Sequence, residues 1–558
     1  MKSKTKSYGL KVALTLVTII AINYIGSYIY QRFDLTADKR FTLSDAALQT
    51  IDDVHSPLII DVFLEGEFPS EFRRLRDETR QLLEEFKIYN SNVNFGFINP
   101  LADEDTRRQN LQQLNQRGLR PFQISLKESG KTTQEVIIPW ALASYNEQTV
   151  IIPLIKNKIG ATDQELVNSS IQNLEYAFAE AFKKLVTPKQ KKIAVLKGNG
   201  QLKDIYLADL LRKLGEHYFL APFTLDSVSN NAQKTLDELN DYDLIISAKP
   251  SEAFSEQEKY VLDQYTMNGG KSLWLTESVI MDRDSLMNDS GNAIAVIKDL
   301  NLNDFFFKYG VRINPVIVND MYSAPITLAI GEGSNSQFQP LQWQYSPLAA
   351  SNPNHPITTN LDPVKFDFAS QIDTLKNTVD KTILLRSSPL TKLEGTPREI
   401  SLDVVTKETD AQTYKDPNQT LAVLLEGTFT SVYDKRIKPT KLNSDKTISS
   451  PTKMIVIADG DVIKNEVIKN QPQELGFEFL SKRKFGNKEF LENAINYLLN
   501  DDGLINIRTK EVKLAFLDLE KVKEEKSKWQ IINIVLPLVI LGIFGLLFSY
   551  LRKRKYAN

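Results

Sequence analysis

Two long apolar stretches without a charged residue bracket the chain, and short apolar runs alternate with amphipathic segments between them. Residues 12–30 read VALTLVTIIAINYIGSYIY, and residues 529–551 read WQIINIVLPLVILGIFGLLFSYL. At about 1.5 Å per helical residue they extend roughly 28 and 35 Å, enough to cross a hydrocarbon core of about 30 Å. The pattern predicts a transmembrane helix at each end of a large body.

Basic residues flank both stretches on the side away from the body. Lys2, Lys4, Lys6 and Lys11 precede the first stretch, and Arg552, Lys553, Arg554 and Lys555 follow the second. Because positive charge stays in the cytoplasm, residues 1–11 and 552–558 are predicted to be cytoplasmic and the body to lie across the membrane. Residues 511–528 would form a juxtamembrane segment.

Each apolar stretch has an alternative interpretation. The first could be a cleaved signal peptide, but it stays bulky up to Tyr30 and has no small-x-small cleavage signal. The second could be a buried core helix, but an interfacial Trp529 precedes it and a basic tail follows it. Two uncleaved anchors are therefore favoured.

The pattern after the first stretch predicts an α/β domain over residues 31–188. Residues 58–66 (LIIDVFLEG) and 93–100 (VNFGFINP) are predicted strands, and a charged amphipathic helix lies between them. This order predicts a βαβ unit with parallel strands. A further amphipathic helix over residues 163–185 ends before Pro188.

A second α/β domain is predicted over residues 189–510. Strands such as KKIAVLK and YDLIISA alternate with helices, which predicts a parallel sheet covered on both faces. Gly, Asn, Ser and Pro concentrate in residues 281–375, which are interpreted as an insertion with little helix. Residues 489–500 (EFLENAINYLLN) are a predicted closing helix, and residues 504–512 (LINIRTKEV) a last strand.

Composition excludes several classes of chemistry. The net charge is −2 and the two basic ends contribute eight positive charges, so the body carries about −10, without the basic stripe of a nucleic-acid-binding protein. The chain has no cysteine, which removes disulfides, thiol catalysis and thiolate metal sites. Its three histidines, His55, His217 and His355, are too far apart in sequence to indicate a zinc site. No metal or cofactor is predicted.

Two predicted turns follow strands and carry polar side chains. Asn199, Gly200 and Gln201 follow one strand, and Asp459 and Asp461 follow another. In open α/β sheets ligands collect beyond the carboxyl ends of strands, so the two aspartates could hold a hard cation or a sugar hydroxyl. The alternative is that Asp and Asn only cap turns.

The Gly-Gly-Lys-Ser run at residues 269–272 is not interpreted as a phosphate-binding loop. Tyr265 stands where the first glycine of that motif belongs, and a helix is predicted before the run and a strand after it.

Polar and small residues inside the two apolar stretches are candidates for helix contacts in the membrane. They are Asn23, Gly26, Asn533, Pro537, Gly542 and Gly545. Small residues permit close approach of helices in lipid, and a buried amide gains from a partner. The alternative is that they are ordinary members of a span.

Several segments together resemble the auxiliary, substrate-binding-like component of gliding-motility ABC transporters (GldG). They are RFDLTADKRFTLS, LEYAFAEAF, IAVLKGNGQL, FSEQEKYVLDQYTMNGGKSLWL, MIVIADGD and WQIINIVLPLVILGIFG. The resemblance covers nearly the whole chain. It implies a thioredoxin-like domain, then a flavodoxin-like or class I amidotransferase-like domain, both without catalytic residues. Asn199 and Gln201 depart from the histidine and acid expected there.

The resemblance also implies a location and partners. The chain would lie in the inner membrane of a bacterium, with its body in the periplasm, beside a membrane permease and a cytoplasmic ATPase. The expected function is that of a non-enzymatic auxiliary subunit. Two alternatives stay open from the residues alone: an exported solute- or carbohydrate-binding receptor, and a hydrolase that uses Asp459, Asp461 or another carboxylate pair.

Overall fold

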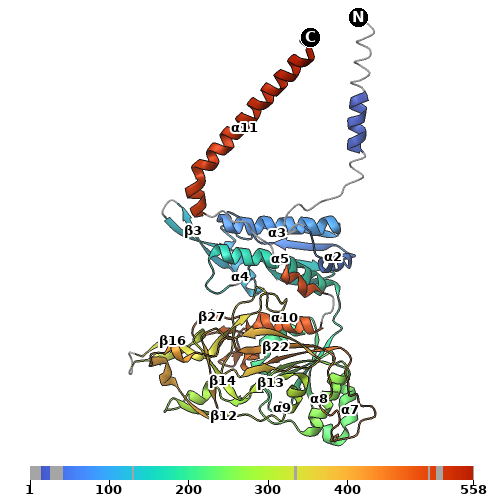
Figure 1. The fold of residues 1–558 in the computed structure, drawn as a ribbon, viewed down its shortest axis with the longest axis vertical. Helices are drawn as coiled ribbons and strands as arrows, with labels where there is room; N and C mark the ends of the chain where they lie inside the picture. The colour runs from blue at the N-terminus through green and yellow to red at the C-terminus, as the bar shows by residue number, and fades with distance from the viewer. Residues whose placement is uncertain are drawn as a thin grey trace. The chain divides into compact units, whose positions relative to one another are not determined.

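The structure, a computed structural model, divides the chain into two compact units, residues 1–511 and 512–558 (Figure 1). It describes residues 14–24, 42–128, 131–156, 158–331, 336–499, 503–510 and 519–556. In the described part of the second unit the chain forms one long helix, α11 (Leu519–Tyr556). The first unit contains a short apolar helix, Leu14–Tyr24, and the body, residues 42–510.

Among the described residues, one helix is long and apolar enough to cross a membrane. It is Glu524–Lys555 within α11, with a mean hydropathy of 2.8, and it contains the second predicted span. The first predicted span, residues 12–30, is described only as the helix Leu14–Tyr24. Residues 25–30 lie outside the described part of the chain, so that span stays a prediction.

The first region of the body, residues 42–187, is built on a four-stranded sheet in the order β2-β1-β5-β6. These strands are β1 (Leu58–Val62), β2 (Val93–Phe97), β5 (Trp140–Tyr145) and β6 (Gln148–Pro153). As predicted, β1 and β2 are parallel and a helix, α3 (Ser70–Tyr89), connects them. Alternate residues of β1 are buried, which is typical of a strand with one covered face.

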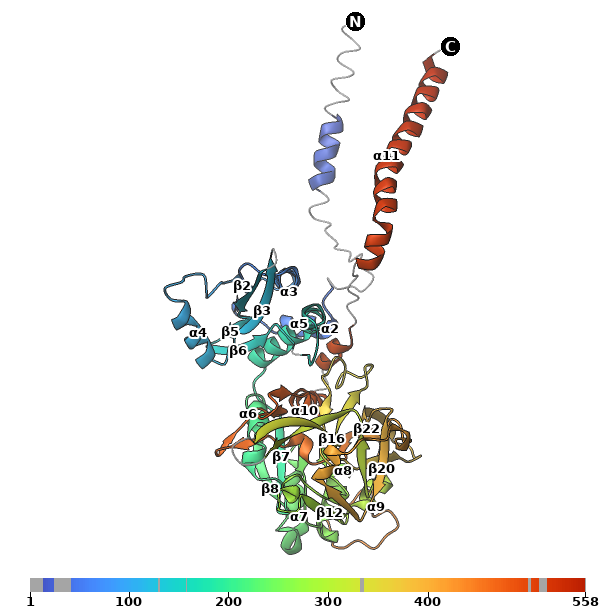
Figure 2. The ribbon, with the colours of Figure 1, turned by 90° about the vertical axis from the view of Figure 1, so that its left-hand side faces the viewer.

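The other elements of this region are α2 (Asp45–Asp52), α4 (Arg107–Gln116), α5 (Asp163–Val186) and the hairpin of β3 (Phe122–Glu128) and β4 (Lys131–Ile137). The helix α5 begins with a capping box, in which Thr162 and Glu165 satisfy each other's free backbone N–H groups. It packs on α2 and α3 (Figure 2).

The second region, residues 190–510, is built on a ten-stranded sheet. Its parallel part contains, in spatial order, β8 (Phe219–Thr224), β7 (Lys192–Lys197), β9 (Leu244–Ala248), β10 (Lys271–Leu275) and β23 (Thr452–Ile457). An antiparallel part follows beside β23: β22 (Thr420–Gly427), β19 (Asp380–Arg386), β16 (Gln337–Ser351) and β15 (Ser323–Ile330), with β17 (Val364–Lys365) beside β16.

Both sheets are therefore mixed. The prediction of two parallel-sheet units is right for β1 with β2 and for the five parallel strands of the large sheet, and wrong for the antiparallel strands beside them. In the first region the cause is local. Asn146 and Glu147, with φ of 45° and 66°, form a two-residue turn between β5 and β6. A turn with two left-handed residues returns the chain beside itself and makes the neighbouring strands antiparallel.

Helices cover both faces of the parallel strands, as predicted. One face packs against α6 (Ala208–Gly215) and α10 (Asn487–Leu499). The other packs against α7 (Val228–Asn240), α8 (Glu256–Met267) and α9 (Asn303–Tyr309). Because side chains alternate along a strand, β23 contributes to both of these cores, and the central strands are apolar almost throughout.

Residues 281–375 contribute to this fold in two ways. The helix α9 packs in the main core, and β15 and β16 extend the large sheet. Smaller sheets complete the second region. One has three strands, β11 (Val279–Ile280), β12 (Asn292–Ile297) and β21 (Arg398–Ser401). The others are two-stranded: β13 (Val311–Asn314) with β18 (Gln371–Thr374), β14 (Val316–Asp320) with β20 (Thr391–Gly395), β24 (Val467–Ile468) with β25 (Gln471–Pro472), and β26 (Phe477–Glu478) with β27 (Arg483–Lys484).

The last predicted strand is a 3₁₀ helix, η7 (Leu504–Thr509). It follows Gly503, whose left-handed φ of 72° turns the chain, and it packs on α5 of the first region. Its apolar residues are buried by this contact instead of by a neighbouring strand.

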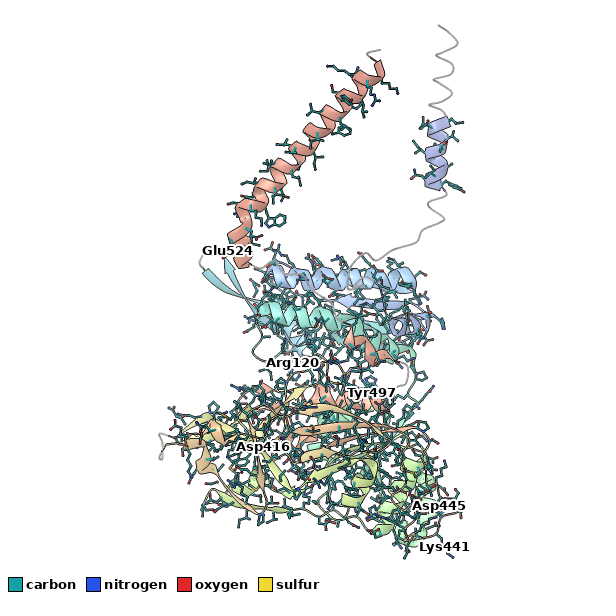
Figure 3. The ribbon with its side chains drawn as sticks, viewed as in Figure 1. Arg120, Asp416, Lys441, Asp445, Tyr497 and Glu524 are labelled. Carbon is teal, nitrogen blue, oxygen red and sulfur yellow. The ribbon has the colours of Figure 1, made fainter. Side chains whose placement is uncertain are left out.

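A cluster of buried charges joins the two regions of the body. Arg508, on η7, donates to Glu489 Oε1 at 2.7 Å and lies 5.2 Å from the ring of Tyr176. Lys156, from the first region, donates to the same oxygen at 2.6 Å. We call this contact the junction. Glu489 lies near the start of α10, and Tyr497, labelled in Figure 3, lies near the end of the same helix, where its hydroxyl donates to Glu426 Oε1 at 3.0 Å.

Glu492, also on α10, makes stability depend on pH. Burial raises the pKa of Glu492 to about 7, against the lowering effect of Lys488, Lys184 and Lys213, and Glu180 raises it further. Since the folded protein favours the protonated acid, stability is expected to fall as pH rises from about 4.5 through 7.

Replacing Glu492 by Gln is expected to raise the free energy of unfolding at pH 8 by up to about 3 kcal/mol and to change little at pH 4.5. Thermal unfolding at both pH values measures this. The exposed Glu399→Gln on β21 is the matched control and should leave the pH dependence unchanged. An equal stability of Glu492→Gln and the wild type at pH 8 would contradict the buried-acid interpretation.

Candidate functional site

The carboxyl ends of three adjacent parallel strands bring charged side chains together. Lys249 directly follows β9, Glu277 follows β10, and Asp459 and Asp461 follow β23. The strands pair in the order β9-β10-β23, so their ends lie at one edge of the sheet. The structure thus places both predicted aspartates at the position where ligands collect in such sheets. We call these four residues the strand-end cluster.

The cluster holds its own cations. Lys249 Nζ lies 2.5 Å from Asp461 Oδ2 and 3.7 Å from Glu277 Oε1. Lys298 Nζ donates to Glu277 Oε1 at 2.7 Å. Glu277, Asp459 and Asp461 each place an oxygen within 4.8 Å of the others, which is close enough for a shared cation. A divalent ion would have to displace Lys249, whose pKa the surrounding carboxylates raise well above its usual value.

Asp459 is the most deeply placed member of the cluster. It has no exposed surface, and its two carboxyl oxygens accept the backbone N–H groups of Asp367 at 2.6 Å and Asp461 at 2.7 Å. Burial and the nearby Asp461 and Glu277 raise the pKa of Asp459 well above its usual value. A carboxyl group without exposed surface does not touch a substrate in this conformation, which argues against a catalytic role for Asp459 itself.

A second network of ion pairs continues the cluster. Arg283 contacts Asp367 at 2.8 Å and Glu478 at 3.3 Å, and Lys365 contacts Glu478 at 2.9 Å. The backbone of Asp367 also donates to Asp459, so the two networks are joined. Residues from 281–375 therefore supply the cations Arg283 and Lys365, which pair with the acids next to Asp459.

The turn at residues 198–201 lies at the same edge of the sheet, after β7. The backbone N–H of Asn199 donates to Gln201 Oε1 at 2.8 Å, and Ser251 Oγ donates to the Gly200 carbonyl at 2.9 Å. Because Lys249 and Ser251 belong to one loop, that loop connects this turn to the strand-end cluster. Asn199 Oδ1 and Gln201 Nε2 are buried without a hydrogen-bond partner among the described residues.

Some of these residues had a signal in the sequence. Lys249 and Glu277 follow apolar strands. The rule that ligands collect beyond the carboxyl ends of parallel strands, which selected Asp459, therefore selects them as well. Arg283, Asp367 and Lys365 follow no such strand, and their contacts span up to 195 residues of sequence, as for Arg283 and Glu478. No local pattern identifies them.

Gly460 allows the backbone of the cluster to approach Lys249. A Cβ atom on Gly460 would lie 2.4 Å from Lys249 Cβ and 2.9 Å from its Cα, closer than real Cβ contacts. We expect Gly460→Ala to lower the free energy of unfolding by about 1–3 kcal/mol because the loop must shift. Gly395→Ala, where a Cβ meets nothing within 4 Å, is the control for thermal unfolding. Equal thermal unfolding temperatures for Gly460→Ala and Gly395→Ala would contradict this explanation.

The run at residues 269–272 has a helix before its glycines and a strand after them. The helix α8 ends at Met267 and β10 begins at Lys271, so Lys271 and Ser272 belong to the strand. A Cβ on Gly270 would lie 2.3 Å from the ring of Tyr265, so an aromatic side chain fills the space beside this turn.

The membrane-contact candidates lie on two helices. Asn23 donates to the Ile19 carbonyl of its own helix at 3.1 Å, and Gly26 lies outside the described residues. On α11, at about 100° per residue, Asn533 and Pro537 share one side, while Gly542 and Gly545 lie toward the opposite side. One partner helix would therefore not contact all four; their role stays a prediction.

Comparisons with known proteins cover the whole chain. A model of a family described as "ABC-type uncharacterized transport system" matches residues 190–494, and a model of a domain of unknown function matches residues 37–144. An "Uncharacterized protein" of Borreliella burgdorferi is 22% identical over 568 residues, with 100% of both chains covered. The solved "mmIFT52 N-terminal domain" has 13% identity and a TM-score of 0.32, covering 56% of this chain and 99% of that chain. At this TM-score the two structures do not indicate a shared fold or function.

Proposed function

This chain belongs to an uncharacterized ABC-type transport auxiliary family, and on that premise we propose that it is a non-enzymatic auxiliary subunit that binds an ABC permease in the membrane. The match over residues 190–494 is the observation that carries the proposal. The permease would connect the chain to a cytoplasmic ATPase. The described residues support a non-enzymatic role, because ion pairs within the protein occupy the strand ends where a ligand would bind in such a sheet.

The link to gliding motility, and the thioredoxin-like and amidotransferase-like folds, rest on the resemblance of the segments given above. A βαβ unit followed by an antiparallel strand pair and a helix supports the first fold. Helices on both faces of parallel strands support the second.

The body's two chain ends meet, which supports two anchors in one membrane. Glu175, on α5, accepts the Ser44 backbone N–H at 2.7 Å with Oε1 and the Lys510 ammonium at 2.7 Å with Oε2. Lys510 also donates to the Thr42 carbonyl at 2.7 Å. The described chain thus enters and leaves the body at one place, an arrangement that suits two ends running to the same bilayer.

Single cysteines test this topology, since the chain has none of its own. Ile437, whose side chain is 94% exposed, reports the body, and Lys555 reports the basic tail. We expect a membrane-impermeant maleimide to label Ile437→Cys in cells with a permeabilised outer layer and Lys555→Cys only after lysis. Labelling of the tail in unlysed cells would overturn the proposed orientation.

Replacing the spans tests whether they bind a partner. If residues 12–30 and 529–551 are exchanged for unrelated apolar helices of equal length, we expect the chain to stay in the membrane but to migrate as a smaller species on a native gel. An unchanged complex would show that the spans only anchor the body.

A further inference from the structure

A cavity of about 400 Å³ lies where the two regions of the body meet. Its walls come from the C-terminal half of α5, the connecting segment 187–191, the loop before β8, α10 and η7. Small-molecule sites usually measure about 300–1,000 Å³ and lie between domains. The cavity is separate from the strand-end cluster, since the two share no lining residue.

Basic side chains outnumber acidic ones around this cavity. Its lysines are Lys183, Lys184, Lys189 and Lys191, and its acids are Glu180 and Glu216. Both acids are already engaged: Lys184 lies 3.0 Å from Glu180, and Lys213, outside the lining, lies 2.6 Å from Glu216.

The two lysines of the connecting segment are held weakly. Lys189 donates to the Gly215 carbonyl, a neutral partner. Lys191 lies 2.9 Å from Asp243 in an exposed pair. Exposed ion pairs are worth about 0–1 kcal/mol, so an anion entering the cavity can recruit these ammonium groups at little cost.

The inner wall combines fixed polar groups with apolar surface. Tyr218 donates to Asn496 Oδ1 at 2.7 Å, and Asn496 donates to Glu180 Oε1 at 3.2 Å, so these side chains are fixed in orientation. Leu504 and Ile505, on η7, supply an apolar wall beside them. Such a site is suited to a ligand with one charged end and one apolar end.

We propose that this cavity binds a small organic anion that carries an aromatic or other apolar group. Its negative end would contact Lys189 and Lys191 at the connecting segment, and its apolar end Ile505. A ligand in this position touches both regions and the segment between them, so it would stabilise their present arrangement. This site goes beyond the proposed auxiliary function and does not depend on a permease.

The full chain in detergent can be tested with 4-fluorophenyl phosphate as the probe, because ¹⁹F relaxation detects weak binding. We expect saturable line broadening by the wild type. Lys189→Glu, which reverses one charge, and Ile505→Trp, which fills the cavity, should each weaken binding at least tenfold. Lys192→Glu changes the total charge equally at an exposed site outside the lining and should bind as the wild type does.

Three results would overturn the proposal. They are no saturable broadening by the wild type, equal binding by Lys189→Glu and the wild type, and equal binding of neutral 4-fluorobenzyl alcohol. A thermal unfolding curve for each variant shows whether it is folded. If Ile505→Trp fails to fold, the surface variant Lys189→Glu alone decides the outcome.

Discussion

Replacing Lys249 by Met is expected to lower the free energy of unfolding of the body by about 3–5 kcal/mol. Lys249 Nζ is the cation nearest to Asp461 and also faces Glu277, and the side chains of all three are at most 14% exposed. Removing it takes the nearest counter-charge from Asp461 and leaves Lys298 as the close cation of Glu277. Thermal or denaturant unfolding of the full chain in detergent measures the loss.

A double variant separates this effect from lost packing. Lys249→Met with Asp461→Asn removes both partners of the closest ion pair and should recover part of the stability lost by the single variant. Lys464→Met is the matched control, since Lys464 lies 3.7 Å from Asp461 and is more exposed. If Lys249→Met unfolds within about 0.5 kcal/mol of the wild type, the cluster is not held by this lysine.

Replacing Arg508 by Ala is expected to cost a similar 3–5 kcal/mol and to loosen the junction between the two regions. Its guanidinium donates to the carbonyls of Pro356 and Thr359 at 3.1 and 3.0 Å as well as to Glu489. In the variant the two carbonyls lose these donors, while Glu489 keeps the hydrogen bond from Lys156. Lysine at this position keeps the charge but loses the fork of donors, so Arg508→Lys should recover only part of the stability.

Limited proteolysis reports the junction separately from global unfolding. Lys189 and Lys191 lie in the exposed segment that connects the regions, where trypsin cuts after lysine. We expect Arg508→Ala to be cut there faster than the wild type. Arg312→Ala, which removes an exposed arginine paired with Asp373 at 2.6 Å, is the control. Equal cleavage of the two variants would contradict the role given to Arg508.

The sequence predicted the order of strands and helices along the chain better than the direction in which the strands pair. Apolar runs such as IAVLK and KMIVI located β7 and β23, and the turn residues after them located Asp459 and Asp461. The runs TILLRSS and LAVLLEGTF likewise predicted strands where β19 and β22 lie, but not their antiparallel direction, because an apolar run does not reveal the direction of its neighbour.

The candidate site was predicted only in part for a similar physical reason. Lys249 and Glu277 could have been selected by their place after strands, but their pairing with Asp461 depends on the order β9-β10-β23. Lys156 contacts Glu489 across the two regions, although 333 residues separate them, and Arg508 contacts the same carboxylate from η7. The cavity depends on the packing of α5, α10 and η7, which no sequence pattern specifies.

The central claim is that this chain is a subunit of an ABC transporter complex, and purification from native membranes tests it most directly. The tagged full chain is extracted in a mild detergent, and its partners are identified and counted by mass spectrometry. We predict that an ABC permease and its ATPase co-purify in a fixed ratio to the chain. A chain that elutes alone, while its cooperative thermal unfolding shows that it is folded, would contradict the claim.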